Sequence, residues 1–273
     1  MDRRKLLRRL AAIGLVAPLG AIGPEARAAV TTTGAGKPPG GITPVFKWNG
    51  TNGSNGAVPT LDKAASFHID GSDATHSVNS GDLLLAFLSE VAASGVDPGA
   101  ITLSGFTQVF QSWSGIVRDA LFYKVAGGSE PSSYTPGNWS NTGETKAASL
   151  VCFQAGTFNA GAPIYGFTGP NNENYATTVV ANAVTLAGSH DLYCVMASAD
   201  SSSNAQTFAF STPAGYTGAV NNPLIYGSAT SANPLEEVFF KNLPAGAAGP
   251  ITLNLFDTFG NERRSFSFAI AGA

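Results

Sequence analysis

The stretch Ser265-Phe266-Ser267-Phe268-Ala269-Ile270 decides the fold class, because large apolar and small side chains alternate along it. Successive side chains of a β-strand point to opposite faces of the sheet, so the alternation predicts a strand with Phe266, Phe268 and Ile270 on one face. Similar short apolar segments recur between clusters of Gly, Pro, Asn and Ser. The strands predicted in this way are Leu83–Leu88, Phe106–Phe110, Ala120–Val125, Ser149–Gln154, Thr177–Val184, Leu192–Ala197, Phe208–Ser211, Val238–Lys241, Ile251–Phe256 and Ser265–Ile270.

A faint internal repeat links the two halves of the chain. Four segments of the first half find counterparts in the second, in the same order and at nearly constant separation. The pairs are 82–83 with 191–192, 105–107 with 215–217, 119–124 with 236–241, and 153–156 with 269–272. The pattern predicts an all-β, jelly-roll-like antiparallel β-sandwich over residues 46–273, built from two related halves of about 46–160 and 161–273. Chance similarity, and two tandem small sandwiches, are the alternatives.

The first thirty residues indicate export. A basic start with Arg3-Arg4-Lys5 precedes a weakly apolar run, and Ala26-Arg27-Ala28 forms a small-residue cleavage site. The arginine pair resembles a twin-arginine (Tat) motif. The apolar run is shorter than the roughly 20 residues that span a bilayer, so we expect no stable membrane insertion after cleavage. The sequence therefore predicts a signal peptide at 1–28, a flexible linker at 29–45, and a periplasmic or extracellular location.

Charge narrows the range of partners. The chain has 15 basic and 18 acidic residues, and the signal takes six of the basic and two of the acidic ones. The mature part then has 9 basic and 16 acidic residues, a net charge of −7. An acidic protein with scattered cations is a poor nucleic-acid binder. A surface carbohydrate or a surface protein is the expected partner.

Three segments carry a resemblance to a known family. They are Gly81-Asp82-Leu83-Leu84-Leu85-Ala86, Gly105-Phe106-Thr107, and the most specific one, Phe122-Tyr123-Lys124-Val125-Ala126-Gly127-Gly128-Ser129-Glu130-Pro131-Ser132-Ser133-Tyr134-Thr135. From about Ala74 onward the chain resembles a β-sandwich family of bacterial secreted and surface proteins and phage fibres. The family usually has Trp where Phe106 stands. The resemblance implies a fold and an extracellular location, and it transfers no catalytic residue.

The cysteines and one acidic turn are candidates for cross-linking and metal binding. Cys152 and Cys194 each lie in an apolar strand pattern, so a disulfide and two buried free thiols both remain open. Asp70 and Asp73 flank a glycine turn and could ligate calcium. An Asx-rich turn without a metal is the alternative, and no cofactor is required.

Catalytic patterns are missing. There is no Gly-x-Ser-x-Gly elbow and no His-Glu-x-x-His helix, and Glu236 and Glu237 would point to opposite faces of a strand. A non-enzymatic protein is therefore the leading hypothesis. A polysaccharide hydrolase or lyase and a phage or virion fibre module are the alternatives.

Aromatic rings beside amide side chains suit sugars, which need an apolar face together with hydrogen-bond partners. The loop expected at Gly166–Ala176 is the first choice for such a site. The candidate ligand-binding residues are Asn171, Asn172, Glu173, Tyr175, Trp113 and Trp139. Packing at the ends of the sandwich is the alternative role of the two tryptophans.

Overall fold

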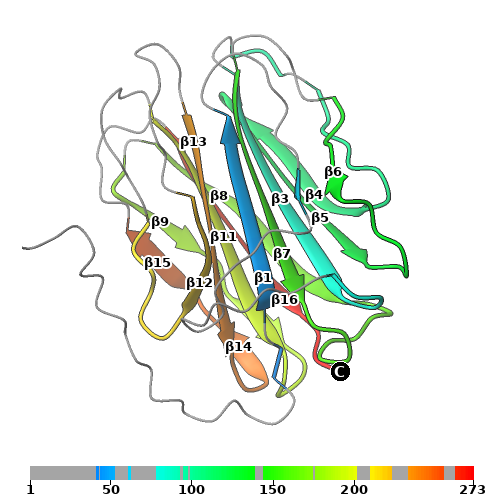
Figure 1. The fold of residues 1–273 in the computed structure, drawn as a ribbon. Coiled ribbons are helices and arrows are strands. Elements are labelled where there is room, and N and C mark those ends of the chain that lie inside the picture. The colour runs from blue at the N-terminus through cyan, green and yellow to red at the C-terminus, as the bar shows by residue number, and fades with distance from the viewer. Residues whose placement is uncertain are drawn as a thin grey trace, which may run out of the picture. The chain divides into compact units, whose positions relative to one another are not determined.

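Two five-stranded antiparallel sheets lie face to face, and each sheet takes all its strands from one half of the chain (Figure 1). This is seen in a computed structural model that describes residues 41–42, 44–52, 61–62, 78–92, 95–97, 99–138, 144–174, 176–201, 210–222, 233–254 and 262–273. The first sheet has the order β1 (Pro44–Asn52), β7 (Glu144–Phe153), β3 (Leu83–Ala92), β5 (Val117–Val125) and β4 (Thr107–Ser114). The second has the order β12 (Thr217–Asn222), β13 (Asn233–Asn242), β11 (Leu192–Ser201), β16 (Glu262–Ile270) and β8 (Ile164–Asn174).

The inner faces of the two sheets share one apolar core. Alternate residues of β3 contribute Leu83, Leu85 and Phe87, and the alternation read in β16 contributes Phe266 and Phe268. Phe87 and Phe268 pack across the core with ring centroids 6.3 Å apart. Because both sheets supply this core, the halves form one sandwich rather than two tandem ones.

The outer faces are also buried, which explains why the strands read as continuous apolar runs. All ten residues of β3 are buried. The outer face of the first sheet packs under Ile101, Leu103 and Tyr134 from the connecting segments. Over the second sheet lie β9 (Thr178–Ala181), β10 (Val184–Leu186), β14 (Gly246–Ala248) and β15 (Ile251–Asn254), and over the first lie β2 (Leu61–Asp62) and β6 (Ser133–Tyr134).

The two halves repeat the same strand order. Reading each sheet from the first strand of its half gives β1-β7-β3-β5-β4 and β8-β16-β11-β13-β12. Each half also has a buried aspartate directly before its central strand, β3 or β11. Asp82 accepts hydrogen bonds from the backbone N–H groups of Asn79 (2.8 Å) and Ala155 (2.9 Å), and Asp191 accepts them from those of Gly188 (2.6 Å) and Gly272 (2.8 Å).

The predicted antiparallel β-sandwich is therefore confirmed, but the jelly-roll connectivity is not. In a jelly roll the strands of both sheets are interleaved along the chain, whereas here each sheet is built from one contiguous half.

Four local predictions differ from the structure. Residues 166–174, expected in a loop, belong to edge strand β8, which pairs with β16. The strand expected at Thr177–Val184 is broken, because β9 pairs with β15 and the following β10 pairs with β14. The linker does not extend to residue 45: Ile42 is buried between the sheets and its carbonyl accepts a hydrogen bond from Asn242 Nδ2 (3.2 Å). Phe210 and Ser211, the described part of one more predicted strand, lie outside every named strand.

The cysteines are buried free thiols rather than a disulfide. Cys194 packs in the core between the sheets, whereas Cys152 faces the outer layer of the first sheet. The pleat of β7 points Cys152 away from the second sheet, which keeps the two sulfur atoms in different layers. Burial raises the pKa of both thiols. In the described part of the chain, no helix is long and apolar enough to cross a membrane.

A polar cluster joins the sheets at one end of the core. Asp119 and Arg264, both fully buried, form an ion pair of 2.8 Å. Ser89 and Ser198, which occupy equivalent places on the central strands, both donate to the carboxylate of Asp119, at 2.7 and 3.0 Å. Arg264 also donates to the carbonyl of Val117 (3.1 Å). A buried charge pair is stable only when its remaining hydrogen-bonding capacity is met, as it is here.

Glu237 makes the stability of the second sheet depend on pH. Burial raises its pKa to about 8, although the backbone N–H of Phe210 donates to the carboxylate. The folded state thus holds a proton that the unfolded chain releases above about pH 4.3. The stabilising contribution is complete below that pH and is lost as the pH rises to about 8. We expect Glu237→Gln to be more stable than the wild type at pH 9, with the difference shrinking toward pH 4, in urea unfolding followed by fluorescence. A difference independent of pH would contradict this assignment.

Candidate functional site

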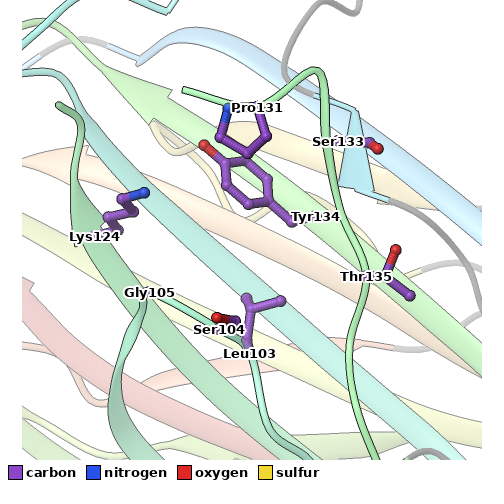
Figure 2. Close-up of a pocket in the computed structure, with 8 residues that line it drawn as sticks. All are labelled: Leu103, Ser104, Gly105, Lys124, Pro131, Ser133, Tyr134 and Thr135. Atoms are coloured by element: carbon purple, nitrogen blue, oxygen red, sulfur yellow. The ribbon is translucent and has the colours of Figure 1, made fainter. Parts of the chain in front are cut away.

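A pocket of about 330 Å³ opens on the outer side of the first sheet (Figure 2). We call it the Tyr134 pocket. Its lining comes from a turn, a loop and one strand: Leu103, Ser104, Gly105, Lys124, Pro131, Ser133, Tyr134 and Thr135. The turn precedes β4, Lys124 lies on β5, and the loop leads into and out of β6.

The turn has a backbone that requires glycine. The N–H of Phe106 donates to the carbonyl of Leu103 (3.1 Å), and Gly105 adopts a φ of +79°. L-residues rarely adopt that conformation. The turn leaves Ser104 and Gly105 exposed at the pocket and buries Leu103 beneath them.

A charged network holds the loop against β5. Lys124 Nζ lies 2.6 Å from Glu130 Oε2, and the hydroxyl of Tyr134 donates to the same oxygen. The other oxygen, Oε1, accepts the backbone N–H of Gly127 at 2.5 Å. Burial opposes ionisation of Glu130, but these hydrogen bonds outweigh it and lower the pKa of the carboxyl. Burial and the bond to Glu130 raise the pKa of Tyr134. The pocket wall therefore carries an ammonium and a neutral phenol, and the ionised carboxylate of Glu130 lies behind them.

Aromatic rings complete the environment of Lys124. Its Nζ lies 5.9 Å from the ring centroid of Phe106 and 5.5 Å from that of Tyr134. The two rings meet edge to face at 5.1 Å. A cation over aromatic faces is stabilised by the ring quadrupoles. The ammonium is thereby kept in place at the pocket.

The second half repeats only part of this arrangement. Lys241 Nζ lies 5.0 Å from the ring centroid of Tyr216, and Gly215 has a φ of +77°. The positions six and ten residues after Lys241, which correspond by spacing to Glu130 and Tyr134, hold Ala247 and Ile251. The carboxylate and the phenol of the network thus have no equivalent at those positions.

The two predicted asparagines serve the scaffold. Asn171 Nδ2 donates to the carbonyl of Val180 (2.5 Å) and to Asn182 Oδ1 (2.8 Å), which ties β8 to the cover of the second sheet. Asn172 donates to Ser114 Oγ (3.0 Å) and accepts from Arg264 Nε (3.2 Å). Both amides therefore make hydrogen bonds within the fold, and neither lines the Tyr134 pocket.

Two further predicted residues, Glu173 and Trp113, lie outside the lining of this pocket. Glu173 is exposed on β8, and Trp113 lies half-buried on β4 with the guanidinium carbon of Arg118 5.6 Å from its ring centroid. Trp139, Tyr175, Asp70, Asp73 and the signal at 1–28 lie outside the described residues. Within the described ranges, no group of three or more His, Cys, Asp or Glu side chains could hold a metal ion.

The pocket was missed in the sequence because its residues are spread over more than thirty positions and include few aromatics. One signal was present. Lys124, Glu130 and Tyr134 all lie in the segment 122–135 on which the family resemblance most depends. The hydrogen bonds and the ion pair among these three side chains hold the segment in place against β5.

Comparison of the chain with protein-family models, with curated proteins and with solved structures finds no match. The class of protein that the geometry defines is an all-β sandwich, and in its described part a polar pocket lies on a covered sheet face.

Because of this network, we expect removal of the Tyr134 hydroxyl to lower the free energy of unfolding more than removal of the Tyr193 hydroxyl. Tyr134→Phe removes a donor to an ionised carboxylate, so we expect it to lower the free energy of unfolding by about 1.5–3 kcal/mol. In Tyr193→Phe the lost partners are neutral, the Asn182 carbonyl (2.8 Å) and Ser267 Oγ (3.2 Å), and about 0.5–1.5 kcal/mol is expected. Urea denaturation of both variants measures the two losses. Equal losses would mean that Glu130 is not the ionised acceptor described here.

Proposed function

We propose that this chain is an exported, non-enzymatic β-sandwich protein that binds a carbohydrate component of the cell surface or its surroundings through the Tyr134 pocket. The observation that carries the proposal is the pocket lining. It sets the exposed hydroxyls of Ser104, Ser133 and Thr135 beside the apolar groups of Leu103 and Pro131. Sugar rings present hydroxyls and apolar C–H faces together, so this lining is complementary to them.

Binding is favoured over hydrolysis by the chemistry of the pocket. Glycoside hydrolysis needs two carboxyl groups on either side of the scissile bond. The eight lining residues contain no carboxylate, and the side chain of Glu130 behind them is only 3% exposed. Its two oxygens are occupied by Lys124, Tyr134 and Gly127.

The buried Asp119 cluster does not supply an alternative active site. Asp119, Ser89, Ser198 and Arg264 have no exposed surface. A substrate would have to separate the two sheets to touch them. This cluster supports the fold, and the Tyr134 pocket remains the better candidate.

Export is supported by the basic start, the apolar run and the small-residue cleavage site. The small share of charged residues, 12% of the chain, and the family resemblance agree with a location outside the cytoplasm. A surface protein is the second partner that the sequence suggests, but a pocket of this size suits a small ring better than a protein face.

The pocket hydroxyls can be tested directly. A glycan array with the mature protein should identify a bound sugar, and titration calorimetry should then show about tenfold weaker binding by Ser133→Ala/Thr135→Val, since each lost hydrogen bond is worth about 0.5–1.5 kcal/mol. Thr185→Val/Thr252→Val, at exposed strand positions of the second half, is the matched control and should bind like the wild type. Equal affinity of both double variants, or release of reducing ends from the bound glycan, would refute the proposal.

A further inference from the structure

We propose that Glu130 determines which sugars the Tyr134 pocket accepts: by neutralising Lys124 it makes the pocket select an uncharged sugar ring and reject sugars that carry a carboxylate. This inference rests on the proposed carbohydrate-binding function and specifies its ligand class.

Lys124 alone would favour anions. Its side chain is 23% exposed and lines the pocket together with the hydroxyls of Ser104, Ser133 and Thr135, a combination that suits a carboxylate ligand. Glu130 changes this balance. Its Oε2 lies 2.6 Å from Lys124 Nζ, and the pair has no net charge.

The carboxylate is fixed in both position and ionisation. Tyr134 and Gly127 donate to its oxygens from two sides, and these donors with Lys124 favour the charged form. A neutral Glu130 would leave the pocket cationic, so ionisation is the state that the specificity requires. The negative charge persists at neutral pH because the hydrogen bonds lower the pKa of the carboxyl.

Few donors of Lys124 remain for a ligand. A lysine ammonium has three N–H donors. One direction is taken by Glu130, and the aromatic faces of Phe106 and Tyr134 lie at 5.9 and 5.5 Å. A carboxylate entering the pocket would compete with Glu130 for the same ammonium and would be repelled by it. The net charge of the mature part, 9 basic against 16 acidic residues or −7, opposes anions further.

The exposed hydroxyls are left as the groups that contact the ligand. Ser104, Ser133 and Thr135 can each donate and accept, which matches the hydroxyl groups of a neutral hexose. The volume of about 330 Å³ lies at the lower end of the range for small-molecule sites. The pocket therefore suits one sugar ring at the end of a chain.

The test compares pairs of sugars that differ only in charge. Binding of methyl galactoside and methyl glucoside, and of the corresponding galacturonide and glucuronide, is measured by NMR titration of the full mature protein. For each pair of sugars of which the wild type binds at least one, we expect the neutral sugar to bind at least tenfold more tightly than its uronide. Glu130→Gln should reduce that preference at least tenfold. Glu173→Gln removes the same charge from an exposed site on β8 and should leave the preference unchanged.

Lys124→Gln provides a second test in the opposite direction, because it leaves the carboxylate without its counterion and should strengthen rejection of uronides. If the melting temperature shows that Glu130→Gln is unfolded, the sugar preference of Lys124→Gln alone tests the role of Glu130. Equal binding of neutral and anionic partners by the wild type, or an unchanged preference in a folded pocket variant, would overturn the role of Glu130. Failure of the wild type to bind any of the sugars, together with a negative glycan array, would instead overturn the proposed function.

Discussion

Central strands of both sheets are buried on both faces, and much of the structure follows from that constraint. Every residue of β3 is buried, so one face of this strand must meet the second sheet and the other must meet connecting segments. Hydrophobic burial favours this stacking, and the two halves that stack share a strand order. Asp119, with its ion pair to Arg264 and its two serine donors, links the same sheets by directional bonds at one end of the core.

The need to cover the outer faces explains where the pocket lies. A segment that crosses an apolar sheet must satisfy its own polar groups. The second half meets this need with the short strand pairs β9–β15 and β10–β14. The first half relies on the pair β2–β6 and on the network of Lys124, Glu130 and Tyr134. The loop that this network holds, which carries Pro131–Thr135, lies beside the Gly105 turn. The space between the loop and the turn is the Tyr134 pocket. The pocket is thus a consequence of how the connecting segments of the first half cover the outer face of their sheet.

The fold was largely predictable from the sequence, because strand alternation and apolar runs are local signals. The repeat of Gly-aromatic-Thr and of the Asp-Leu strand starts indicated two related halves. Strand β8 was missed because its Gly, Pro and Asn residues are typical of loops, and only pairing with β16 holds them in a sheet. Asn171 and Asn172 resembled ligand groups, yet their partners lie on other strands and cannot be read from spacing. The pocket depends on the same kind of long-range placement, with the turn and the loop brought together over β5.

The most direct measurement of the central claim is a map of amide chemical shifts in the isotope-labelled mature protein, recorded as the sugar identified on a glycan array is added. We expect perturbations to gather at Leu103–Phe106 and Pro131–Thr135, with smaller ones at Lys124, and the amides of Asn171–Glu173 to stay unchanged. Perturbations centred on β8, or a saturable shift pattern that avoids the pocket, would show that the sugar binds elsewhere.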